Sequence, residues 1–155
     1  MVDRPILLCT DGSDLAIDAL RSGLDLLAEP GAVVLATVIE ASDPSLVTGT
    51  GFAGGTMTPA ELDALDRQRH DEAAELLAET AASLGITGDA DQRVVDGAPG
   101  PELCALAQSL DARAVVVGTR GRGGFKRALL GSVSDFVVRN APCPVVVVGG
   151  GALDD

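Results

Sequence analysis

Residues 115–148 read VVVGTRGRGGFKRALLGSVSDFVVRNAPCPVVVV, and the rest of the chain is organised around them. The stretch predicts a strand that ends at Gly118, a loop rich in glycine and arginine, a helix that opens at Gly131-Ser132, and a last strand after a proline-bounded turn. Glycines let a loop backbone approach a ligand, and the first N–H groups of a helix have no acceptor within it. Such a strand–loop–helix junction favours a bound phosphate. We therefore interpret it as a candidate nucleotide site.

Short apolar runs alternate with helical patterns along the whole chain. The predicted strands are residues 5–10, 32–39, 92–95, 114–117 and 145–148. The predicted helices begin after N-cap Ser13, after N-cap Thr58, at Pro101 and at Ser132, and they end near residues 27, 84, 110 and 139. This alternation implies one domain over residues 1–150 with a short tail, built as a parallel sheet with helices on both faces. Ligands of such sheets bind beyond the carboxyl ends of the strands.

Composition bounds the class of protein. The 155 residues are 46% hydrophobic, enough for a substantial core, and only three are aromatic, all Phe. The net charge of 11 − 23 = −12 disfavours nonspecific contact with nucleic acid or anionic membrane. No apolar run approaches the roughly 20 residues that span a bilayer, and no signal peptide is evident. We expect a soluble cytoplasmic protein whose three isolated cysteines are reduced thiols.

Four positions in the opening stretch form a spaced pattern. Gly118 and Gly121 are followed, after nine further residues, by Gly131 and Ser132. Two glycines alone are weak evidence because turns use glycine widely, whereas the complete spacing is far more specific. An alternative stays open for Ser132, since Ser132 and Asp135 also fit the capping box S-x-x-D.

Basic side chains gather in the loop between these glycines. Arg120, Arg122, Lys126 and Arg127 are four of the 11 basic residues of the chain and fall within eight positions. They would attract a triphosphate towards the loop, although charges that merely solvate it are the alternative. Arg120 is the strongest candidate, because it lies between two motif glycines.

The motif resembles that of a known family. The spacing G-2x-G-9x-G-(S/T) is that of the ATP-binding branch of the universal stress protein family, and all four positions are present. The resemblance extends over almost the whole chain: residues 10–13 (TDGS) look like the signature after the first strand, and residues 141–145 (APCPV) like the approach to the last. It is weakest over residues 41–57.

The resemblance implies an open, Rossmann-like five-stranded parallel sheet of order 3-2-1-4-5, like that of the adenine nucleotide alpha hydrolases. Asp11 would contact the adenosine, the backbone of Val38 would meet the adenine edge, and the motif residues would line the phosphates. The implied nucleotide-binding set is Thr10, Asp11, Val38, Gly118, Arg120, Gly121, Gly131, Ser132, Val133 and Ser134. Structural alternatives exist for two of them: Val38 is a core strand residue in any case, and Asp11 could simply end the first strand and favour the dipole of the first helix.

The resemblance also implies a function. We expect a sensor or regulator that binds ATP, with Mg²⁺ as a companion, and acts as a homodimer through the edge strand formed by Val145, Val146, Val147 and Val148. The alternatives are a slow ATPase or self-phosphorylating enzyme at the same site, and a family member that holds no ATP or binds another adenine nucleotide such as cyclic AMP.

Two further patterns carry no site. Residues 49–54 satisfy G-x-G-x-x-G, but no strand runs directly into them and no helix opens there, as the dinucleotide fingerprint requires. His70 is the only histidine and lies in an acidic helix near Asp66, which makes a zinc site or a Ser-His-Asp triad implausible. The carboxylates of that helix are interpreted as a solvated face.

Overall fold

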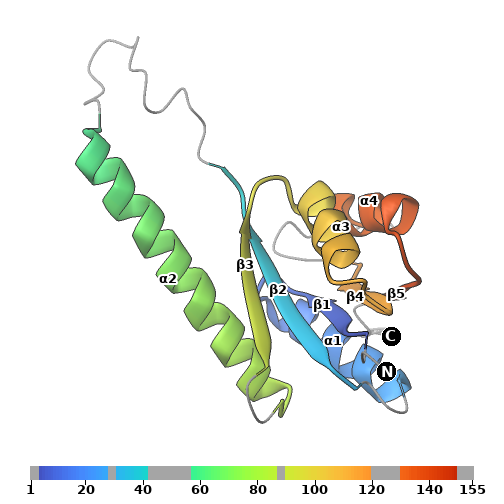
Figure 1. The fold of residues 1–155 in the computed structure, drawn as a ribbon. Coiled ribbons are helices and arrows are strands. Elements are labelled where there is room, and N and C mark those ends of the chain that lie inside the picture. The colour runs from blue at the N-terminus through green and yellow to red at the C-terminus, as the bar shows by residue number, and fades with distance from the viewer. Residues whose placement is uncertain (1–3, 28–30, 42–56, 87–89, 120–129, 150–155) are drawn as a thin grey trace, which may run out of the picture.

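The computed structural model describes residues 4–27, 31–41, 57–86, 90–119 and 130–149 (Figure 1). The strands are β1 (Ile6–Cys9), β2 (Val33–Ile39), β3 (Asp91–Asp96), β4 (Ala114–Gly118) and β5 (Val145–Val148). The helices are α1 (Asp14–Leu26), α2 (Pro59–Ser83), α3 (Pro99–Ser109) and α4 (Ser132–Asn140). Every predicted strand and helix is present, and the ends lie within two residues of those predicted.

All strand pairs are parallel, and the sheet order is β3-β2-β1-β4-β5. This confirms the architecture that the family resemblance implied. Strand β1 is central and pairs with β2 on one side and β4 on the other, with Cys9 opposite both Ala36 and Val117. The strand order reverses between β1 and β4, which is where open α/β sheets hold their ligands.

The sheet is covered on both faces, by α3 and α4 on one and by α1 and α2 on the other (Figure 1). Successive side chains of a strand point to opposite faces, so β1 serves both layers. Leu7 and Cys9 pack with Leu103 of α3 and Val137 of α4. The remaining β1 side chains, Ile6 and Leu8, pack with Leu20 of α1 and Leu77 of α2.

Two helix starts follow from side-chain capping, as the sequence predicted. Ser13 Oγ accepts a hydrogen bond from Ala16 N at 3.2 Å at the start of α1. At the start of α2, Thr58 Oγ1 accepts from Glu61 N at 3.3 Å while Thr58 N donates to Glu61 Oε2 at 2.7 Å. These bonds satisfy N–H groups that have no acceptor in the first helical turn.

Helix α3 begins two residues earlier than predicted. Its first residue is Pro99 rather than Pro101, and Ala98 precedes it without a side-chain cap. Proline suits a first helical position, because its N–H would have no acceptor there and its φ is already helical. Pro101, predicted from the sequence as the start of this helix, therefore lies within its first turn.

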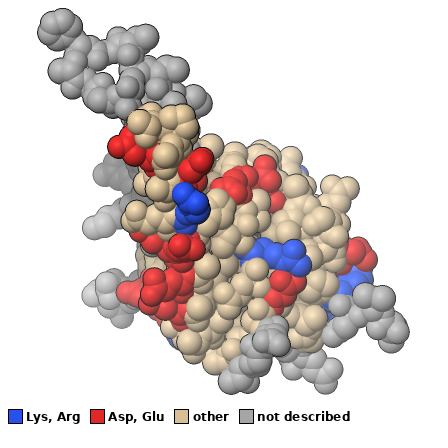
Figure 2. Space-filling model, turned by 60° about the vertical axis from the view of Figure 1, so that its left-hand side comes forward, with Lys and Arg blue, Asp and Glu red and all other residues tan. Residues whose placement is uncertain are grey.

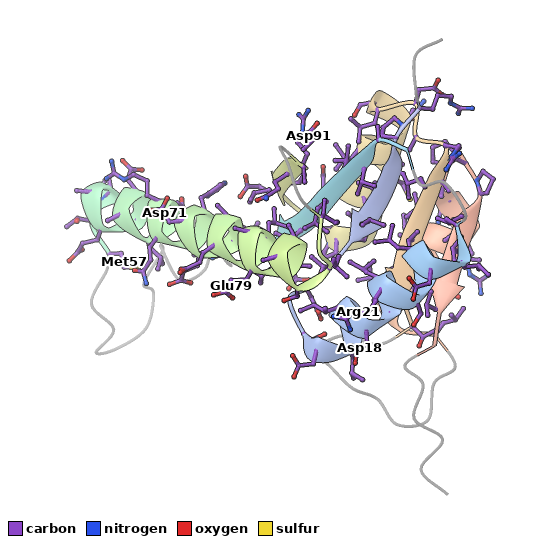
Figure 3. The ribbon with its side chains drawn as sticks, turned by 90° about the horizontal axis from the view of Figure 1, so that it is seen from below. Asp18, Arg21, Met57, Asp71, Glu79 and Asp91 are labelled. Atoms are coloured by element: carbon purple, nitrogen blue, oxygen red, sulfur yellow. The ribbon has the colours of Figure 1, made fainter. Side chains whose placement is uncertain are left out.

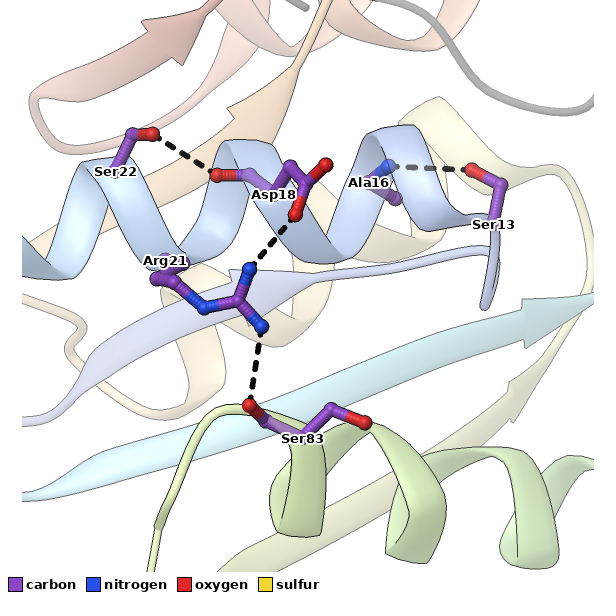
Figure 4. A network of polar contacts seen from close by, with 6 residues as sticks. All are labelled: Ser13, Ala16, Asp18, Arg21, Ser22 and Ser83. Carbon is purple, nitrogen blue, oxygen red and sulfur yellow. Dashed lines mark hydrogen bonds and ion pairs between the residues drawn. The ribbon is translucent and has the colours of Figure 1, made fainter.

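Helix α2 is long, and only its second half is built into the core. Its buried residues are Ala73, Leu77, Thr80 and Ala81. The first half extends beyond the sheet, as the positions of Met57 and Asp71 relative to Glu79 show in Figure 3. Near the other end of α2, Arg21 Nη2 of α1 donates to the Ser83 carbonyl at 3.1 Å (Figure 4).

Aspartate and glutamate side chains gather along α2 (Figure 2). None of the helices that the structure describes is long and apolar enough to cross a membrane. The three cysteines are unpaired thiols; Cys9 is buried, and Cys104 and Cys143 are half-buried. Burial raises the pKa of each thiol, so these groups are protonated at neutral pH.

Candidate functional site

A cleft of about 1070 Å³ opens at the carboxyl ends of β1, β2 and β4. Its floor is formed by the last residues of these strands and the turns that follow. Helix α4 contributes one wall through its N-terminus, α3 contributes Pro99 and Leu103, and α2 contributes a third wall through its middle turns. The cleft therefore lies at the position predicted from the strand order.

The turn between β1 and α1 is held by its own side chains. Thr10 Oγ1 accepts from Gly12 N at 3.0 Å, and Asp11 Oδ1 accepts from Ser13 N at 2.9 Å and from Ser13 Oγ at 2.6 Å. Gly12 has φ +77°, a conformation that glycine adopts without strain. Asp11 thus orders the turn through Ser13, rather than through the helix-dipole contact weighed in the sequence, and it also lines the cleft.

The junction of β4 with α4 is fixed through the backbone. Thr119 N donates to the Val148 carbonyl at 2.9 Å, which extends the pairing with β5. Gly131 N donates to the Thr119 carbonyl at 2.8 Å, and this bond joins the end of β4 to the start of α4. The three described positions of the glycine motif, Gly118, Gly131 and Ser132, therefore converge on one side of the cleft.

The alternative assignment for Ser132, a capping box with Asp135, is wrong. The N-cap of α4 is Gly131, and no side chain makes a capping hydrogen bond there. Asp135 instead pairs with Arg139, at 3.0 Å between Oδ2 and Nε. Ser134 Oγ donates to the Gly131 carbonyl at 3.0 Å, so the buried hydroxyl of the helix start is that of Ser134. The Ser132 side chain is exposed and lines the cleft.

Three amides at the start of α4 precede its first intrahelical hydrogen bond. That bond runs from Asp135 N to the Gly131 carbonyl at 2.9 Å. The amides of Ser132, Val133 and Ser134 therefore lack an acceptor within the helix, and all three residues line the cleft. Unpaired amides at the positive end of a helix dipole are a suitable site for an anionic group.

The chain is similar to known proteins over almost its whole length. Residues 4–149 match the family model of the universal stress protein family. The chain belongs to the universal stress protein family. It is 31% identical over 145 residues to universal stress protein MJ0531 of Methanocaldococcus jannaschii, a match that covers 94% of this chain and 81% of that protein. It is 34% identical over 145 residues to a universal stress protein of Thermus aquaticus, covering 94% and 98%.

Solved structures agree with this assignment. The structure of hypothetical protein MJ0577 superposes with a TM-score of 0.72 at 24% identity, covering 96% of this chain and 97% of that one, and this likeness supports the fold. A universal stress protein in complex with cAMP has a TM-score of 0.60 at 25% identity, covering 96% and 98%. A universal stress protein of Archaeoglobus fulgidus in complex with dAMP has a TM-score of 0.56 at 22% identity, covering 96% and 99%.

Eight of the ten residues singled out in the sequence of this universal stress protein line the cleft. They are Thr10, Asp11, Val38, Gly118, Gly131, Ser132, Val133 and Ser134. The other two, Arg120 and Gly121, lie outside the described residues, as does the rest of the basic loop.

The sequence interpretation missed the α2 wall of the universal stress protein cleft. Glu72, Glu75 and Glu79 line it together with Arg69. The three carboxylates are exposed, as predicted for a solvated helix face. The solvent that they contact is that of the cleft. No local signal could have revealed this, because it depends on how α2 packs against β2 and β3.

Two polar contacts tie the middle of α2 to the sheet. Arg69 Nη2 donates to the carbonyl of Glu40, just after β2. His70 Nδ1 lies 2.9 Å from the Asp66 carbonyl, and His70 Nε2 lies 3.0 Å from Asp96 Oδ2 at the end of β3. The hydrogen bond to the Asp66 carbonyl and then that to the Asp96 carboxylate raise the pKa of His70 above its usual 6.5. The exposed histidine predicted from sequence is thus also a contact between α2 and β3.

The His70–Asp96 contact is expected to make stability depend on pH. Because the folded-state pKa of His70 is raised, its contribution is fully present below pH 6.5 and is lost as the pH rises through that raised value. The melting temperature of wild type should therefore exceed that of His70→Gln more at about pH 5.5 than at about pH 8.5. In an Asp96→Asn background, the difference in melting temperature that His70→Gln causes should be smaller. A difference that does not change with pH would contradict the assignment.

Proposed function

We propose that this universal stress protein binds an adenine nucleotide, ATP, with its phosphates at the start of α4. The observation that carries the proposal is the set of three amides, from Ser132, Val133 and Ser134, that open onto the cleft ahead of the first α4 hydrogen bond. Relatives of the same fold have been solved with cAMP and with dAMP, so an adenylate in this cleft suits the family. The Ser132 hydroxyl, which caps nothing, adds a donor beside these amides.

The nucleoside would lie across the ends of β1 and β2. Asp11 would accept from the ribose, and the backbone of Val38 would meet the adenine edge; both residues line the cleft between the α4 start and β2. Among the residues that the structure describes, no group of three or more His, Cys, Asp or Glu could hold a metal ion. A Mg²⁺ that accompanies ATP would therefore be held mainly by the phosphates and water, and we derive no step through the ion.

We propose further that the protein acts as a homodimeric regulator that pairs through β5. This strand lies at the edge of the sheet, and Val145, Val146, Val147 and Val148 are each only half-buried in one chain. An exposed apolar edge strand favours pairing with another chain. Light scattering at micromolar concentration should give the mass of two chains, and a monomer mass would contradict this.

Mass spectrometry of the natively purified protein tests the nucleotide proposal. We expect a co-purifying adenine nucleotide, and calorimetry with ATP and with cyclic AMP should rank ATP first. Preference for cyclic AMP would assign the site to the ligand seen in the 25% identical relative. Absence of binding by both ligands would reject the proposal.

A further inference from the structure

The two ends of the cleft differ in charge. At the α4 end, backbone amides open onto it. At the α2 end, Glu72, Glu75 and Glu79 line it together with Glu40, which follows β2. Strands β2 and β4 flank β1, so the carboxyl ends of these two strands lie about 10 Å apart. A ligand that fits both ends carries its negative charge on one side only.

Among the described residues that line the acidic end, one basic side chain stands against four glutamates. Arg69 is the one Lys or Arg among the described residues that line the cleft, and its guanidinium donates to the Glu40 carbonyl. Asp11, between the two ends, adds a further carboxylate. A second anion brought to this end would meet like charges, which repel it.

Thr37 gives independent evidence that the α2 end receives a polar ligand. Its side chain is only 6% exposed, and it lines the cleft. Its neighbour two positions earlier, Leu35, packs in the core layer under α1 and α2, so the alternation of β2 directs Thr37 to the same side. The Thr37 hydroxyl makes no hydrogen bond to any residue described here. No fully buried side-chain N or O atom among the described residues lacks a partner, so the Thr37 oxygen reaches the surface of the cleft, where a ligand donor or acceptor could bond to it.

We infer that the α2 end holds the uncharged nucleoside and discriminates against nucleotides with a separate phosphate on the 2′ or 3′ position of the ribose. This inference rests on the proposed function. A ligand whose 5′-phosphates occupy the α4 amides would turn its ribose towards Asp11 and its base towards β2 and Thr37. A phosphate on the far side of the ribose would then face the carboxylates of Glu72 and Glu75.

Two isomeric ligands test the inference, namely ADP and adenosine 3′,5′-bisphosphate. They carry the same number of phosphates and differ in where the second one is attached. Calorimetry on the full-length protein should show ADP binding more tightly by on the order of tenfold. Raising the salt to roughly 0.5 M should reduce the ratio, because ions screen exposed charges.

Charge variants distinguish two reasons for weaker binding of the bisphosphate: repulsion by the acidic wall, and the absence of a β-phosphate that could contact the protein. In the double variant Glu72→Gln with Glu75→Gln, the affinities for ADP and for the bisphosphate should differ by no more than about threefold. The change should come mainly from tighter binding of the bisphosphate. The matched control is Asp63→Asn with Asp71→Asn, which removes two charges from the same helix away from the cleft and should leave the ratio unchanged.

Thr37→Val tests the buried hydroxyl. It should weaken ADP binding several-fold. It should not lower the melting temperature of the unliganded protein, because no protein group loses a hydrogen bond when this hydroxyl is removed. The control is Thr80→Val, a buried threonine of α2 that does not line the cleft, and it should leave affinity unchanged.

The outcomes are distinct. Equal affinities for the two ligands, or a ratio that survives the Glu72/Glu75 double variant, overturn this inference and leave the proposed function intact. Normal binding by Thr37→Val overturns the role of Thr37. If neither ligand nor ATP binds, the proposed function fails, and the inference fails with it.

Discussion

Gly131→Val is expected to weaken ATP binding by about a hundredfold. A Cβ at Gly131 would lie 3.0 Å from the Thr119 carbonyl oxygen, which accepts the hydrogen bond that joins β4 to α4. A valine must push the start of α4 away from β4 and so displace the amides of Ser132 and Val133. Hydrogen bonds to charged groups contribute about 1.5–3 kcal/mol each, so the loss of two at the lower value, about 3 kcal/mol, gives an effect of this size. Calorimetry with ATP measures it.

A second glycine supplies the control. Gly149 follows β5, and a Cβ there would meet nothing within 4 Å, so Gly149→Val should bind ATP normally. Melting curves must show that Gly131→Val remains folded, because the substitution lies at a surface junction and leaves both core layers in place. Wild-type affinity in folded Gly131→Val would remove the α4 amides from the phosphate site.

Gly12→Ala is expected to lower the free energy of unfolding by about 2–5 kcal/mol. Gly12 has φ +77°, and a side chain in this region costs about 1–2 kcal/mol. The added Cβ would also lie 2.4 Å from Leu76 Cδ1 of α2, and overpacking costs about 1–3 kcal/mol more. Urea unfolding measures the sum.

Gly85→Ala isolates the backbone part of that loss. Gly85 has φ +67°, but a Cβ there would meet nothing within 4 Å, so its loss should be about 1–2 kcal/mol. The difference between the two variants reports the contact of the β1–α1 turn with α2. Equal losses would show that Leu76 moves aside freely and that the turn does not set the position of α2.

Local chemistry made much of the fold predictable. Ser13 and the Thr58–Glu61 capping box fix the first residues of α1 and α2 through specific hydrogen bonds. Both caps form as the sequence predicted. Strand order is different in kind, because it depends on which buried strands pair across long connections. Periodicity does not encode that pairing, and the order came from the family resemblance.

The candidate site was predictable only in part, for the same physical reason. Glycine spacing pointed to the amides of α4, since a helix start is a local feature. It did not distinguish Gly131 from Ser132 as the N-cap, because both residues suit that position. The glutamates of α2 enter the cleft through a contact between elements far apart in the chain, and their sequence resembles any solvated helix face.

Helix α2 has the geometry of a lever. Its core contacts fall between Ala73 and Ala81, close to the cleft, while its other end lies at Pro59. With a rise of 1.5 Å per residue, a tilt of about 10° around Thr80 moves Pro59 by about 5 Å. Because Glu72 of the cleft wall lies eight residues from Thr80 and Pro59 lies 21 residues from it, such a tilt displaces the far end of the helix about 2.6 times as much as the wall.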